Sequence, residues 1–145
     1  MKPRTDIPKR LAQHDLLYYK IERESKQGFE KKWNKASGNT YTDDDTELQT
    51  WLNTGNNYGV LTGYNDLLVV DFDDEEAHKK LAPCLPETFV VESGSGGYHY
   101  YYFCSDMQSK QQLVGDENEV LVDLQYNGCG AVGPGSTHPK GEAYS

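Results

Sequence analysis

Two aspartates, Asp71 and Asp73, stand one residue apart at the end of segment 67–73, which is otherwise apolar. If this segment is a strand, side chains at this spacing project from one face, with their Cβ atoms about 7 Å apart. Carboxylates so placed can hold one or two divalent cations, and oxygen ligands suit Mg²⁺ or Mn²⁺. Two such ions about 4 Å apart stabilise both the attacking and the leaving oxygens of a phosphoryl transfer. In the alternative interpretation, Asp73 or Asp74 only caps a following helix and Asp71 only ends the strand.

A third acid, Asp123, interrupts the apolar segment 120–125. An ionised carboxylate in a buried strand is costly unless it is paired or coordinated, and a metal ion would meet that requirement. Alternatively the strand is half buried, and Leu121, Asp123 and Gln125 face solvent together. The sequence leaves both interpretations open.

A glycine-rich segment, 93–97, separates two apolar stretches and includes Ser95, Gly96 and Gly97. Glycines let backbone N–H groups approach an anion closely. His99 begins the next stretch, with its side chain on the same face as Tyr101. The segment can therefore cradle a triphosphate. It lacks the G-K-[ST] ending of a P-loop, and the alternative is an ordinary turn between strands.

Charged residues are divided unequally along the chain. The net charge is −9, which by itself argues against a nucleic-acid partner because phosphate binding needs an excess of Lys and Arg. Residues 1–40, however, carry ten Lys and Arg against five acids, whereas residues 41–145 carry four against eighteen. The first part predicts a surface for polyanions, with Lys31 and Lys32 as candidate DNA contacts. The alternative is a solvated basic helix face.

Short strands and a few helices must position these residues. Residues 7–21 suit an amphipathic helix, or a helix that runs into a strand at 17–19. Leu48, Trp51 and Leu52, at helical spacing, predict a helix that ends at Gly55, and a second short helix is expected from 74 to about 81. Apolar runs bounded by turn residues predict strands at 58–62, 67–73, 88–92, 98–103 and 120–125.

These elements describe one α+β domain of 145 residues with flanking helices and a mixed, mostly antiparallel sheet. Residues 1–57 are expected to form a basic helical and loop part, and residues 58–145 the sheet that carries the site. No stretch approaches the roughly 18 apolar residues of a membrane span. The first residues do not resemble a signal peptide, so we expect a cytoplasmic protein without a membrane partner.

Five motifs occur in the order and spacing of a known family. They are Gly59–Gly63 (GVLTG), Leu68–Asp73 (LVVDFD), Ser95–Tyr100 (SGGYHY), Val122–Gln125 (VDLQ) and Gly133–Gly141 (GPGSTHPKG). The chain resembles the bifunctional DNA primase/polymerase N-terminal domain, the prim-pol branch of the archaeo-eukaryotic primase superfamily. The resemblance covers residues 58–144 well and the first 57 residues loosely.

The resemblance implies a fold and roles for particular residues. The implied fold is a modified RNA-recognition-like sheet with the catalytic residues on its open face. Asp71, Asp73 and Asp123 match the catalytic metal ligands, which would hold two Mg²⁺ or Mn²⁺ ions, and His99 matches the histidine that contacts the nucleotide phosphates. The segment Ser95, Gly96 and Gly97 would lie beside the triphosphate.

The implied activity is metal-dependent, template-directed nucleotidyl transfer, as a DNA primase/polymerase in the replication of a plasmid, virus or mobile element. Its partners would be a single-stranded DNA template, a primer, dNTPs or NTPs, and a helicase or accessory domain. We expect the 145-residue chain to extend an existing primer weakly and to start new DNA chains poorly or not at all. The alternatives are a nuclease that uses the same carboxylates and a non-catalytic nucleotide- or DNA-binding module.

Overall fold

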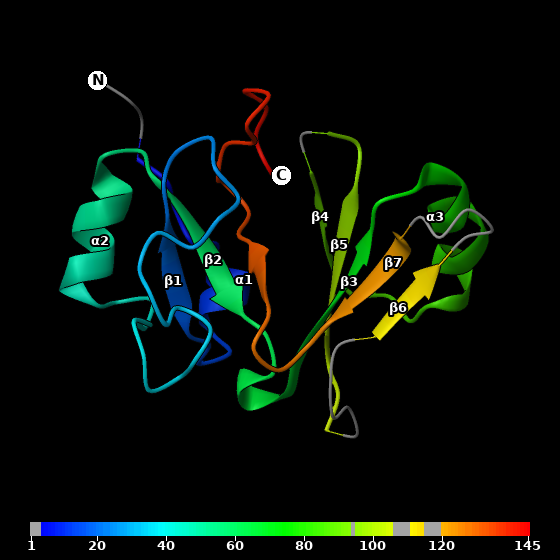
Figure 1. Ribbon diagram of the computed structural model, residues 1–145, viewed down its shortest axis with the longest axis horizontal. Helices are drawn as coiled ribbons and strands as arrows, with labels where there is room; N and C mark the ends of the chain where they lie inside the picture. The colour runs from blue at the N-terminus through cyan, green and yellow to red at the C-terminus, as the bar shows by residue number, and fades with distance from the viewer. Residues whose placement is uncertain (1–3, 94, 106–110, 115–119) are drawn as a thin grey trace.

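The computed structural model describes residues 4–93, 95–105, 111–114 and 120–145. Its strands form two sheets that lie side by side, with helix α2 on the outer flank of one sheet and α3 beside the other (Figure 1). The helices are α1 (Lys9–Ala12), α2 (Thr46–Asn53) and α3 (Glu75–Leu81). The strands are β1 (Tyr18–Ile21), β2 (Asn57–Leu61), β3 (Leu67–Phe72), β4 (Phe89–Glu92), β5 (Tyr98–Phe103), β6 (Gln111–Val114), β7 (Val120–Gln125) and β8 (Gly130–Val132). The α+β class expected from the sequence is confirmed.

Each sheet is antiparallel in every pairing between described strands. The smaller sheet has the order β1-β2-β8, and the larger has the order β4-β5-β3-β7-β6. The expected mixture of parallel and antiparallel pairing is not found in the described part of the chain, because neighbouring strands in both sheets run in opposite directions. Strand β3 lies at the centre of the larger sheet, between β5 and β7.

The alternation of side chains along β3 separates two cores. Leu67 and Val69 face a buried cluster that both sheets share. Val70 and Phe72 face the opposite side, where they pack with Ala77 of α3. Since successive side chains of a strand point to opposite faces, Asp71 continues the row of Leu67 and Val69 and faces the smaller sheet.

Two glycines bring the strands of the smaller sheet close to a tyrosine. The ring of Tyr19 on β1 lies across Gly59 of β2 and Gly130 of β8, and a Cβ atom at either glycine would overlap it. Tyr19 is buried. The glycines therefore determine how closely this ring packs on β8, which forms one wall of the site described below.

Both helices predicted in the middle of the chain are present, each with an aspartate at its start. The side chain of Asp45 accepts a hydrogen bond from the backbone of Glu47, and α2 ends before Gly55, which has a φ of 82°. The side chain of Asp74 accepts from the backbone of Ala77 over 2.8 Å. These bonds satisfy backbone N–H groups that have no partner inside the helix.

The strands differ from the sequence-based expectation in two places. β1 confirms the alternative in which the first helix runs into a strand, but it covers Tyr18–Ile21 in place of the expected 17–19, and α1 has only four residues. β6 was not expected, and it pairs with β7 at the edge of the larger sheet. Short strands of four residues contain too few alternations to be distinguished from loops. Among the described residues, no helix has the length and apolar character needed to cross a membrane.

Candidate active site

Three carboxylates meet at the end of β3. The strand register places Asp71 opposite His99 of β5 on one side and opposite Asp123 of β7 on the other. Asp73 directly follows β3, and its backbone N–H donates to the carbonyl oxygen of Leu121 over 3.1 Å, which holds it beside β7. One carboxylate oxygen from each aspartate lies within 4.8 Å of the other two. The three side chains are close enough to share a cation.

Asp74, and not Asp73, is the residue that caps α3. The helix therefore does not require the carboxylate of Asp73, which lines a cleft together with Asp71. The alternative interpretation is therefore confirmed for Asp74, which caps the helix, and it leaves the position of Asp73 in the cleft unexplained.

The clustering of acids is reflected in the pKa of Asp73. Burial, followed by the negative charges of Asp71 and Asp123, raises the pKa of Asp73 to about 6, while His99 and Lys26 act in the opposite direction. Like charges at short range disfavour the ionised form. A divalent cation is the kind of group that would remove this repulsion, and an all-carboxylate set of oxygen ligands fits Mg²⁺ or Mn²⁺.

His99 lies beside the carboxylates and is almost completely buried, with 7% of its surface exposed. Its Nε2 is 3.4 Å from Oδ1 of Asp71. Its ring stacks against that of Tyr144, with the centroids 6.0 Å apart. The other nitrogen, Nδ1, has no hydrogen-bond partner among the described residues. Buried polar atoms are almost always paired, so the imidazole has capacity to bind a further polar group.

A cleft of about 180 Å³ opens beside these residues, between the end of the larger sheet and β8 of the smaller one. Its lining comprises Lys26, Asp71, Asp73, Ser93, Ser95, His99, Gly130, Ala131, Val132 and Tyr144. Ser95 therefore lies in the same cleft as Asp71 and Asp73, and its contact with phosphate stays a prediction. Gly96, with a φ of 90°, and Gly97, whose N–H donates to Oγ of Ser93 over 2.8 Å, form the turn that leads into β5.

The comparison with protein families agrees with this geometry. A family model described as bifunctional DNA primase/polymerase, N-terminal, matches residues 9–145. The chain belongs to this family. The match includes all residues that line the cleft and confirms the resemblance seen in the sequence. No curated protein matches the chain.

Two ionisable residues of the prim-pol cleft were not singled out from the sequence. Lys26 comes from the loop after β1, and Tyr144 comes from the C-terminal segment, where Ser145 and Glu92 exchange two backbone hydrogen bonds. Burial and the charge of Asp71 raise the pKa of Tyr144 to about 12. The only sequence signal for Lys26 is the basic character of residues 1–40, which does not distinguish one lysine from another.

Lys31 and Lys32 do not line the carboxylate cleft. Both are exposed in the loop between β1 and α2. There Asn39 donates two hydrogen bonds, one from its side-chain amide to the backbone carbonyl of Lys31 and one from its backbone N–H to the backbone carbonyl of Lys32. Their contact with DNA stays a prediction.

Proposed function

We propose that this prim-pol domain is a metal-dependent, template-directed nucleotidyltransferase. The observation that carries the proposal is the convergence of Asp71, Asp73 and Asp123, the first two of which line a cleft that also contains His99. Family membership alone supports the general activity of a DNA primase/polymerase. The cluster adds residues of the kind that this reaction needs.

The proposed mechanism assigns each group a distinct task. Asp71, Asp73 and Asp123 would hold the cations. Bound Mg²⁺ or Mn²⁺ would activate the attacking 3′ oxygen and neutralise charge on the triphosphate. The imidazole of His99 and the hydroxyl of Ser95 would donate to phosphate oxygens, and Lys26 would place a positive charge beside them. Positioning and electrostatic stabilisation then contribute most of the rate enhancement.

A primer-extension assay tests this proposal. A labelled primer annealed to a longer template, with dNTPs and Mg²⁺ or Mn²⁺, should be extended and release pyrophosphate. Asp71→Asn should reduce extension by at least about 100-fold, because it removes a charged ligand. Asp44→Asn is the matched control, since this aspartate is exposed and outside the cleft, and should extend like the wild type. Wild-type extension by Asp71→Asn would contradict the assignment.

The role of His99 is tested in the same assay. His99→Ala should raise the apparent KM for dNTP about tenfold, as expected for the loss of a hydrogen bond to a charged group. The affinity for primer-template DNA, measured without dNTP, should stay the same because the imidazole would touch phosphates of the nucleotide only. An unchanged KM would exclude this role.

The assay also separates the two alternatives. Shortening of the labelled strand without dNTPs would indicate a nuclease that uses the same carboxylates. Binding of dNTP without any product would indicate a non-catalytic module. The proposed setting is the replication of a plasmid, virus or mobile element, with a single-stranded template, a primer and a helicase or accessory domain as partners.

A further inference from the structure

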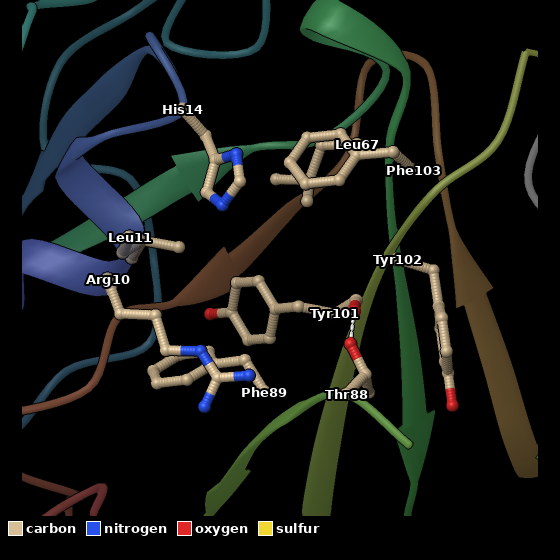
Figure 2. A pocket seen from close by; sticks show the side chains of 9 residues that line it. All are labelled: Arg10, Leu11, His14, Leu67, Thr88, Phe89, Tyr101, Tyr102 and Phe103. Atoms are coloured by element: carbon tan, nitrogen blue, oxygen red, sulfur yellow. Dashed lines mark hydrogen bonds between the residues drawn. The ribbon is translucent and has the colours of Figure 1, made fainter. Parts of the chain in front are cut away.

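A second pocket lies at the opposite end of β3 and β5 from the carboxylates. Leu67 and Phe103, which pair at this end, are four residues from the pair Asp71 and His99, or about 13 Å at about 3.3 Å per residue. The pocket has a volume of about 260 Å³ and lies between α1 and the larger sheet (Figure 2). Pockets for drug-sized ligands have about 300–1,000 Å³. This one suits a single planar ring system.

Five of the nine residues that line the pocket have aromatic side chains, namely His14, Phe89, Tyr101, Tyr102 and Phe103. Phe103 remains 49% exposed, although its ring contacts that of His14, with centroids 4.8 Å apart. On the other side of the pocket, the guanidinium carbon of Arg10 lies 5.4 Å from the centroid of Phe89 (Figure 2). An exposed aromatic face and a flat guanidinium are both surfaces on which a nucleic-acid base stacks.

A buried hydroxyl adds a polar group to this lining. Tyr101 is 96% buried, since 4% of its surface is exposed, and its hydroxyl has no hydrogen-bond partner among the described residues. Figure 2 shows this hydroxyl pointing away from β5 toward the side of the pocket formed by Leu11 and Arg10. Burial raises the pKa of Tyr101, so the hydroxyl keeps its proton and can both donate and accept. A base edge offers the matching groups.

We propose that this pocket binds an unpaired base of a DNA strand. Its rings would stack on the base, and the hydroxyl of Tyr101, which is buried in the structure without the strand, would meet the base edge once the side chains around it shift. The charge of the pocket favours a strand over a free nucleotide, because Arg10 is the one Lys or Arg among its lining residues. One cation matches a single phosphodiester and not a triphosphate. The inference rests on the proposed function, which requires a template strand, but uses none of the carboxylate residues.

Fluorescence anisotropy of a labelled, unstructured single-stranded oligodeoxynucleotide tests the proposal, with EDTA and without dNTP. Phe103→Leu keeps an apolar side chain but removes the ring, and should weaken binding about fivefold or more. Phe29→Leu is the matched control. Phe29 is 52% exposed and contacts Trp51 in the same tilted geometry, with centroids 4.8 Å apart, but lies outside the pocket. It should bind like the wild type.

Tyr101→Phe distinguishes a role of the hydroxyl in binding the strand from a role in stabilising the fold. Removing an unpaired buried hydroxyl should leave the melting temperature unchanged or higher, yet weaken binding of the strand about two- to fivefold. An oligonucleotide of the same length with abasic sugars throughout should bind equally to the wild type, Phe103→Leu and Tyr101→Phe, because only base contacts are removed by these changes.

Three results would overturn the proposal. The first is equal binding of the oligonucleotide by Phe103→Leu and Phe29→Leu, and the second is wild-type binding of the oligonucleotide by Tyr101→Phe. The third is competition by free dAMP at equal nucleotide concentration, which would assign the pocket to a mononucleotide. Since the assay contains neither metal nor dNTP, a lack of primer extension would contradict the proposed function and leave this measurement intact.

Discussion

Asp73 shows what it costs to gather three acids around one point. Its carboxyl group reaches solvent at the edge of the cleft, yet its pKa is raised to about 6 by burial and by Asp71 and Asp123. At neutral pH the folded protein must ionise this group against those charges. The repulsion between these charges makes the folded state less stable than the same fold would be without it. Such a loss of stability is typical of functional sites.

This cost predicts a pH-dependent effect of Asp73→Asn. The pKa of Asp73 is higher in the folded protein than its usual value of 3.8, so the folded state binds the proton more tightly. The free energy of unfolding therefore falls as the pH rises from about 4 to about 6 and stays lower above that range. In EDTA at pH 8, Asp73→Asn should be more stable than the wild type by up to about 1 kcal/mol, since solvent screens part of the repulsion.

Thermal unfolding at pH 8 and below pH 4 measures this effect. The difference between Asp73→Asn and the wild type should disappear at the lower pH, where the carboxyl group is protonated in both states. Mn²⁺ at pH 8 should raise the melting temperature of the wild type more than that of the variant. A variant that is less stable than the wild type in EDTA at pH 8 would contradict the electrostatic explanation.

At the scale of elements, β3 organises the site. It pairs with β5 and β7, and the registers place His99 and Asp123 opposite the same residue, Asp71. Groups on paired strands are held more rigidly than groups on loops, which favours a preorganised metal site. The helix that follows is started by Asp74, so adjacent aspartates have separate tasks.

This division predicts different results for the two neighbours. Asp74→Ala should lower the free energy of unfolding by about 0.5–2 kcal/mol, the usual cost of losing a helix cap, without changing the stabilisation by Mn²⁺. Asp45→Ala removes the corresponding cap of α2 and should behave alike. Urea unfolding with and without Mn²⁺ measures both quantities. If Asp74→Ala removed the stabilisation by Mn²⁺, Asp74 would be a ligand and the separation of tasks would be wrong.

At the scale of the whole molecule, positive charge is concentrated in the first 40 residues and negative charge in the remainder. An acidic body repels a nucleic acid, so DNA binding should depend strongly on the basic part and on the salt concentration. Lys26 already brings one positive charge from this part to the carboxylate cleft.

The exposed lysines of the same loop test this arrangement. Replacing Lys31 and Lys32 by glutamate should weaken single-stranded DNA binding roughly tenfold at low salt, and the difference should shrink as salt is raised. In the control variant, Lys79 and Lys80 are replaced by glutamate. These two lysines are exposed on α3, at the far side of the larger sheet. Anisotropy titrations over a range of salt concentrations compare the two. Equal losses of DNA affinity in the two variants would show that binding depends on the net charge of the protein and not on where the lysines lie.

Several features of this protein follow from the sequence alone because their causes are local. The spacing of Asp71 and Asp73 matches the two-residue period of a strand, and apolar positions at helical spacing predict the helix between Asp45 and Gly55. The family motifs likewise identify the three aspartates and His99 as candidates. Each of these signals, taken singly, spans only a few residues of the chain.

Only the tertiary structure decides which distant residues meet. The convergence of Asp123 with Asp71 depends on the register of β7 against β3, and the division of the strands between two sheets depends on which partner each strand finds. Lys26 and Tyr144 reach the cleft from opposite ends of the chain, and Arg10 and Phe103 meet at the second pocket. Strand pairing and packing join segments far apart in sequence, and local periodicity contains no information about the partner.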